Sequence, residues 1–173
     1  VNYAREYMEE QGYEVLVFHA TGSGGKTMEH LIDQGFFDGV LDITTTEWND
    51  ELFGGVLAAG PNRLESAGKL GVPQIVSVGA IDEINFGHID TLPEAMKSRN
   101  IYKHNPMVTL VRTTPEENKA VGEKIAKKLN MSNGPTVLIS PLKGNGYLSE
   151  EGMPFYDAEA DAALLQALRD NLD

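Results

Sequence analysis

The chain has 173 residues, 41% hydrophobic and 23% charged, which is typical of one globular domain. It contains no cysteine, which excludes a disulfide scaffold, a thiolate metal site and a cysteine nucleophile. The formal net charge of −12 and the absence of a long Lys/Arg run argue against nucleic-acid binding. Because the apolar runs are shorter than the roughly 18 residues of a membrane span, and no secretory signal is visible, we expect a cytoplasmic protein with no membrane partner.

The sequence alternates between helix-like and strand-like segments. It opens on a helix-like segment, "NYAREYMEEQG", and starts with Val, so we expect it to be part of a longer protein. Strands are predicted at residues 13–19, 39–45, 73–79, 107–113 and 134–141. Helices are predicted at residues 26–34, from about residue 61, and after residues 114 and 157. This order predicts an α/β fold: a three-layer, Rossmann-like domain with a mainly parallel sheet of about five strands.

Two helix starts carry clear capping signals. Thr114, Pro115 and Glu117 form the pattern of a capping box with proline in the first turn. Ala120, Val121, Ile125 and Leu129 then mark one apolar helix face. Asp157 is the predicted N-cap of the last helix, whose apolar stripe is Leu164, Leu165, Leu168 and Leu172. The long segments 80–105 and 142–156 follow strand ends, where α/β sheets bind ligands, so they are candidate walls of a site.

The stretch "VFHATGSGGKTMEH", residues 17–30, is a glycine-rich turn between a predicted strand and a predicted helix. A Walker A loop would need glycine at position 20, where the chain has Ala20, although Gly25, Lys26 and Thr27 fit. A dinucleotide fingerprint is matched by Gly22 and Gly24, but its third glycine position holds Thr27. Its acidic residue would be Asp42 or Glu47. Neither motif is complete.

A more general mechanism remains for this loop. Thr21, Gly22, Ser23, Gly24 and Gly25 lead into a helix whose first N–H groups and dipole favour an anion, either phosphate or carboxylate. The alternative is a tight turn in which the glycines serve only packing. The spacing favours the anion site.

Several other side chains are candidate site residues. His19 and His104 are candidates for proton transfer. The alternative for His19 is a buried histidine bonded to the backbone. Asn105 is a candidate ligand contact, or a turn residue that serves the backbone before Pro106.

Arginines and carboxylates complete the candidate set. Arg63 and Arg112 are candidate phosphate or carboxylate clamps; the alternatives are ion pairs, of Arg63 with Glu65 or another neighbour and of Arg112 with Glu116. Asp42 and Asp82 are candidate magnesium ligands. For the acidic stretch that contains Asp82, Glu83 and Asn85, a solvated loop is the alternative.

Four blocks of the sequence resemble one known family. They are "GYEVLVFHATGSGGKTMEHLIDQGFFDGVLDITTTE", "GPNRLESAGKLGVPQIVSVGAIDEINFG", "YKHNPMVTLVRTTPEEN" and "GMPFYDAEADAALLQAL". They resemble the C-terminal half of an uncharacterised family named for the ATP-binding domain of the tomato mosaic virus resistance protein. The resemblance implies two Rossmann-like halves in one chain, of which this is the second, and ATP as a ligand. It also argues against a Walker role for Lys26.

Two functions are compatible with these observations. The first is binding of ATP, another nucleotide or a phosphometabolite, with magnesium as a possible cofactor, in a cleft between this domain and its N-terminal half. An enzyme of this kind would be a hydrolase or group transferase acting on a small acyl or phosphoryl substrate. The second is a non-catalytic scaffold that dimerises, with ATP as a regulator bound mainly by the other half. A homodimer is the expected assembly.

Overall fold

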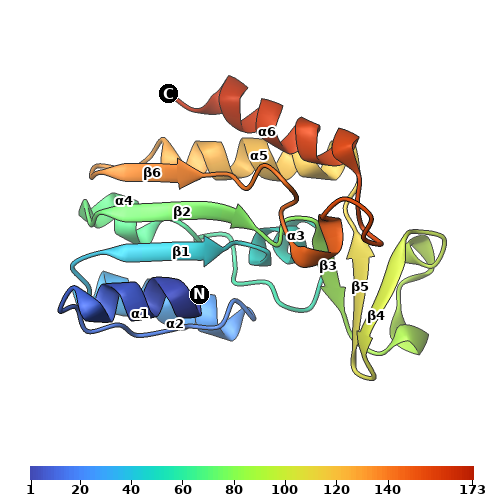
Figure 1. Cartoon of the computed structure of the whole chain (residues 1–173), viewed down its shortest axis with the longest axis horizontal. Coiled ribbons are helices and arrows are strands. Elements are labelled where there is room, and N and C mark those ends of the chain that lie inside the picture. Colours follow the sequence, from blue (N-terminus) through green and yellow to red (C-terminus); the bar gives the residue numbers. More distant parts are fainter.

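The main sheet of the domain is parallel and has three strands. The structure is a computed structural model that describes residues 1–173. Strands β1 (Val40–Thr44), β2 (Gln74–Gly79) and β6 (Thr136–Ile139) lie in the order β1-β2-β6 (Figure 1). The helices are α1 (Asn2–Glu10), α2 (Ser23–Asp33), α3 (Glu47–Phe53), α4 (Ser66–Leu70), α5 (Pro115–Leu129) and α6 (Ala158–Asn171).

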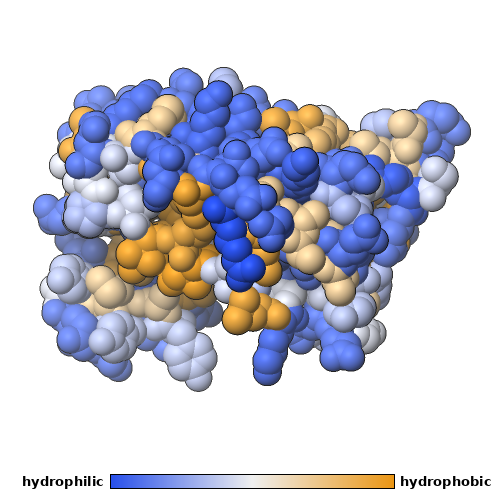
Figure 2. Space-filling view, turned by 90° about the horizontal axis from the view of Figure 1, so that it is seen from above, coloured by the Kyte–Doolittle hydropathy of each residue, from blue (hydrophilic) through white to orange (hydrophobic).

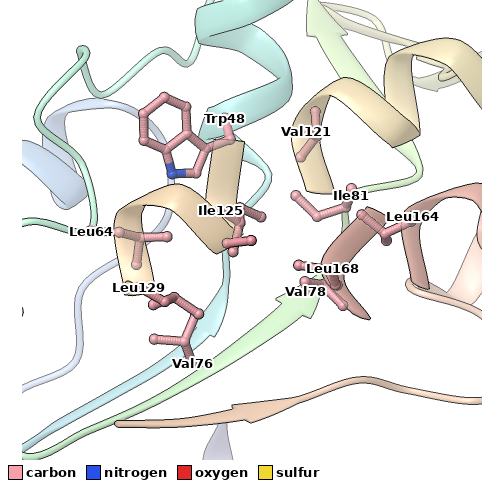
Figure 3. Packing of buried hydrophobic residues seen from close by; sticks show 11 residues of the cluster. Trp48, Leu64, Val76, Val78, Ile81, Val121, Ile125, Leu129, Leu164 and Leu168 are labelled. Atoms are coloured by element: carbon pink, nitrogen blue, oxygen red, sulfur yellow. The ribbon is translucent and has the colours of Figure 1, made fainter. Parts of the chain in front are cut away.

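Helices cover one face of this sheet and form the main core with it. Figure 1 shows α4 behind β2 and α5 behind β6, whereas α1 lies beyond β1, in front of α2. Val76 and Val78 of β2 belong to the same buried cluster as Ile125 of α5 and Leu168 of α6 (Figure 3). The apolar stripes predicted for the last two helices are therefore largely confirmed, except that Ala120 is exposed.

Both predicted helix caps are present. The Thr114 hydroxyl accepts a hydrogen bond from the Glu117 amide, and the Glu117 carboxylate accepts one from the Thr114 amide. Asp157 Oδ1 accepts from the amides of Glu159 and Ala160 at the start of α6. The local sequence was sufficient here because a cap depends only on residues within one turn.

A second, antiparallel sheet stands at the end of the main one. It consists of β3 (Glu83–Phe86), β4 (Ile101–Asn105) and β5 (Val108–Arg112) in the order β3-β5-β4, and it protrudes from the main sheet (Figure 1). Short 3-10 helices cover Ile89–Thr91, Glu94–Met96 and Tyr147–Ser149. The strand predicted at 107–113 thus exists but is antiparallel, because segment 80–105 supplies two strands that pair with it.

The strand predicted at residues 13–19 does not form. These residues make no β-bridge, and Tyr13, Leu16 and Val17 are each more than half exposed. Strand-forming side chains stabilise a strand only when a neighbouring strand and a packed layer receive them, and this segment has neither. The α/β class is confirmed, but the parallel sheet has three strands rather than five. No helix is long and apolar enough to cross a membrane.

Candidate functional site

The glycine-rich loop does lead directly into a helix. Helix α2 begins at Ser23, three residues earlier than the predicted start at Lys26. Gly22 is the N-cap and has a φ of 79°, a conformation that favours glycine. The sequence therefore located correctly the element whose first amides could bind an anion.

A carboxylate of the protein itself occupies those amides. Glu47 Oε1 accepts hydrogen bonds from Gly22 N at 2.7 Å and from Gly25 N at 3.2 Å. Glu47 is 1% exposed, so this contact is buried. The Ser23 amide donates to the Thr21 carbonyl. Of the loop amides from Gly22 to Gly25, Gly24 N alone has no acceptor.

The glycines of the loop are required by close packing. A Cβ at Gly24 would overlap the carbonyl oxygen of His19, and one at Gly25 would overlap the Glu47 carboxylate. A Cβ at Gly22 would lie 2.9 Å from the carbonyl oxygens of Leu57 and Ala58. These contacts account for the three glycines without a ligand, which is the packing alternative of the sequence analysis.

Arg63 lies beneath this loop in a buried cluster of acids. Its Nε donates to Glu47 Oε2 at 2.7 Å, and its Nη1 and Nη2 donate to the two carboxylate oxygens of Asp42. Nη1 also contacts Glu29 Oε1 at 3.3 Å. Arg63 is 3% exposed. Burial alone would lower the pKa of Arg63, but the charges of Asp42 and Glu47 outweigh it, so the pKa is raised and the guanidinium stays charged.

This arrangement changes what Arg63 and Asp42 can do. The guanidinium that was a candidate phosphate clamp is saturated by three carboxylates from β1, α2 and α3. Both carboxylate oxygens of Asp42 accept hydrogen bonds from Arg63, so Asp42 does not fit a magnesium site. No group of three or more His, Cys, Asp or Glu side chains is arranged to hold a metal ion. The alternative that Arg63 forms ion pairs is confirmed, but its partners are Glu29, Asp42 and Glu47 and not Glu65.

Comparison with known proteins identifies the family of this chain. The family described as "Uncharacterised protein family (UPF0261) C-terminal domain" matches this chain over residues 1–173. The chain belongs to UPF0261. It is 56% identical to a UPF0261 protein of Clostridium tetani over 173 residues, which are 100% of this chain and 43% of that protein. It is 50% identical to a UPF0261 protein of Rhizobium meliloti over 156 residues, which are 90% of this chain and 39% of that protein.

A plant protein is also similar to this UPF0261 domain. The tomato mosaic virus resistance protein Tm-1 of Solanum lycopersicum is 44% identical over 169 residues, which are 98% of this chain and 22% of that protein. The susceptible protein tm-1 matches with the same identity and coverage. Similarity to Tm-1 therefore does not indicate a role in resistance. The chain spans less than half the length of these relatives.

Arg112 of the UPF0261 domain is also buried and bound internally. Its Nε donates to the carbonyl of Phe155 at 2.7 Å, its Nη1 to Thr113 Oγ1 and its Nη2 to Asp161 Oδ1, the last two at 2.8 Å. It therefore ties β5 to the start of α6. The surface pair with Glu116 does not form, and Arg112 is 4% exposed.

Three carboxylates near the second sheet have raised pKa values. Burial raises the pKa of Asp50 to about 6, although hydrogen bonds from the amides of Asn85 and Leu57 oppose the shift. Burial, together with the charges of Asp82 and Asp50, raises the pKa of Glu83 to about 8. Burial likewise raises the pKa of Asp82, which is 0% exposed and whose carboxylate oxygens accept no hydrogen bond. The alternative of a solvated loop is therefore wrong for these residues: Asp82 is buried, and Glu83 and Asn85 belong to strand β3.

The remaining candidates do not converge on the glycine loop. His19 is exposed just before the loop, contrary to the alternative of a buried histidine. His104 and Asn105 are exposed at the end of β4, in the other sheet. Asn105 Oδ1 accepts from the Met107 amide at 2.8 Å, as expected of the turn residue. The two histidines therefore belong to separate elements, and the structure groups neither with a carboxylate and a nucleophile.

The sequence analysis missed two acidic residues that lie next to the glycine loop, Glu29 of α2 and Glu47 of α3. Glu47 was considered only as the acidic residue of an incomplete dinucleotide fingerprint, and Glu29 was not considered. A signal existed for Glu29, because it lies four residues after Gly25 and so shares its helix face. No local signal could show that Glu47, 22 residues beyond Gly25, would reach back to the loop.

Proposed function

We propose that this domain is a non-catalytic assembly module, one part of a larger protein in which any nucleotide or phosphometabolite is held mainly by the other part. The observation that supports this proposal is the Glu47 carboxylate on the amides of Gly22 and Gly25. A helix N-terminus that is already neutralised by a buried acid has little to offer a second anion.

Electrostatics around the loop supports the same proposal. An anion approaching these amides would meet the carboxylates of Glu47, Asp42 and Glu29, with Arg63 as the only cation among them. Three negative charges against one positive charge leave the cluster anionic. Displacing Glu47 would also leave part of the Arg63 guanidinium without its partner, which is costly in a buried site.

The proposal extends to the finer architecture of the fold. In the assembled protein the face of the parallel sheet opposite α4 and α5 is covered by polypeptide outside residues 1–173. This second layer completes a three-layer, Rossmann-like arrangement. A homodimer is the alternative way of completing it.

Calorimetry with Mg-ATP and with inorganic phosphate tests the proposal. We expect no saturable heat with this chain, and none with Lys26→Ala. A chimera in which this chain replaces the matched region of the C. tetani relative should bind Mg-ATP, and Lys26→Ala should leave its affinity unchanged within about twofold. Binding by the isolated chain that Lys26→Ala weakens would overturn the proposal; a chimera that binds neither probe would overturn its ligand assignment.

One observation favours nucleotide binding at the loop itself as a second candidate. The Gly24 amide has no acceptor, and the Ser23 and Lys26 side chains beside it are exposed. A phosphate at the rim of the loop could accept from these three groups while Glu47 stays in place. In that case Lys26→Ala would weaken binding in both forms, and His19, exposed next to the loop, would be the nearest group for proton transfer.

A further inference from the structure

The face of the main sheet opposite α5 is apolar and uncovered. Leu41 pairs with Ile75, and Ile75 pairs with Val137, so these three side chains point to the same side. Ile139, two residues beyond Val137, shares that side. Their exposed fractions are 40%, 37%, 52% and 51% in chain order. We call these four residues the open face.

This exposure is unusual for the kind of sheet that carries it. Parallel strands are normally covered on both faces, and their residues read as hydrophobic on both sides. Here the neighbouring residues Val76 and Val78 are fully buried on the helix-covered side. Figure 2 shows a hydrophobic area lying in a hollow between hydrophilic walls, as seen from the side of α6 and β6.

The N-terminal helix lies beside the sheet and does not cover the open face. In Figure 1 helix α1 lies beyond the edge strand β1 and in front of α2, and none of its residues is buried. Tyr3 is 90% exposed and Tyr7 is 62% exposed. The segment that follows, residues 13–19, also exposes Leu16 and Val17. A helix and a strand-like segment with unburied apolar side chains next to an open sheet indicate a missing packing layer.

The relatives indicate what supplies that layer. The matched region is a C-terminal domain by its family description, and it makes up 43% of the C. tetani relative. More than half of that relative therefore lies outside the match. Because the matched region is a C-terminal domain, polypeptide that precedes it in such a relative continues into the part that corresponds to α1.

We propose that the open face is the docking surface for the N-terminal part of the longer family members. The contact is apolar, centred on Ile75 and Val137, and α1 is packed between the two parts. This inference rests on the proposed assembly role and adds to it the surface through which assembly occurs.

Cysteine labelling tests the docking surface, because this chain has no cysteine of its own. Ile75→Cys and Val137→Cys are made in this chain and in the chimera with the N-terminal part of the C. tetani relative, whose cysteines outside the chain are replaced by serine. We expect rapid labelling in the isolated chain and labelling slower by more than about tenfold in the chimera, since reaction then requires the interface to open.

A matched control lies on the covered side of the sheet. Lys127→Cys on α5 is exposed in the isolated chain and should label at the same rate in both forms. Carbene footprinting of the unmodified C. tetani relative, full length against its matched region alone, makes the same comparison without any substitution or chimera.

Each other outcome rejects a defined part of the inference. Equal labelling of Ile75→Cys in both forms, while the two parts still co-purify after cleavage of the connection between them, would overturn the docking surface but leave the assembly role intact. Separation of the parts after cleavage, with equal labelling, would overturn both. Labelling that slows with rising concentration of the isolated chain, together with a dimer in sedimentation equilibrium, would assign the face to a second copy.

Discussion

At the residue scale, the glycine loop shows how one pattern can serve two purposes. Gly22, Gly24 and Gly25 allow a close backbone approach, which is also what a phosphate loop requires. In this domain the approaching groups are the carbonyls of His19 and Leu57 and the carboxylate of Glu47. The role of the glycines is therefore steric, and the amides of Gly22 and Gly25 are bound by Glu47.

Replacement of Gly24 measures this steric role. Gly24→Ala should lower the free energy of unfolding by more than about 2 kcal/mol, because its Cβ would overlap a backbone oxygen that cannot move alone. Gly12→Ala, at a φ of 90° with no heavy atom within 4 Å of the added Cβ, should cost only about 1 kcal/mol of backbone strain. Urea unfolding of both variants gives the comparison, and equal losses would contradict the packing account.

The buried acid Glu83 predicts a dependence of stability on pH. Its pKa is about 8 in the fold and 4.5 as the ordinary value, so the folded state binds more protons between these limits. Stability is then greatest below pH 4.5 with respect to this group, falls as the pH rises towards 8, and is level above it. Between pH 6 and 8 the loss should reach roughly 2 kcal/mol at most.

Glu83→Gln isolates that contribution. The variant should remove most of the loss between pH 6 and 8 in urea unfolding, whereas the exposed Glu116→Gln should keep it. Asp50, with a pKa of about 6, acts mainly below this window. If wild type and Glu83→Gln lose stability in parallel, the carboxyl is ionised in the fold and the assigned burial is wrong.

At the element scale, the positions of most strands were predictable but their pairing was not: β1, β2, β5 and β6 lie where strands were predicted. The cap of α5 and the apolar stripes of α5 and α6 follow from residues within a few turns of each other. The segment 13–19 has the composition of a strand but no partner to pair with, and β5 has the composition of a parallel strand but antiparallel partners. Pairing depends on distant segments, which local patterns do not report.

The capping box of α5 gives a prediction at this scale. Thr114→Ala removes the acceptor of the Glu117 amide and should lower the free energy of unfolding by about 1 kcal/mol. Thr27→Ala is the matched control: its hydroxyl bonds back to the Ser23 carbonyl inside α2, so the change should stay within about 0.5 kcal/mol. Thermal and urea unfolding measure both, and a larger effect for Thr27→Ala would contradict the assignment of the cap.

Across the whole molecule, helices cover only one face of the parallel sheet. One face of the parallel sheet packs against helices around Val76 and Ile125, while the other exposes Ile75 and Val137. The buried arginines Arg63 and Arg112 hold loops and strands together instead of facing solvent. The alternation of strands and helices predicted the α/β class, but only the three-dimensional arrangement distinguishes a saturated arginine from an available one.

In this domain the amides of Gly22 and Gly25 bind Glu47 and leave no place for a ligand. Amide NMR of the isolated chain, titrated with Mg-ATP to millimolar concentrations, tests this most directly at Gly22 and Gly25. We expect both amide resonances to stay where they are in the free protein throughout the titration. Saturable shifts of both resonances would show that the nucleotide displaces Glu47, and the loop would then be a nucleotide site.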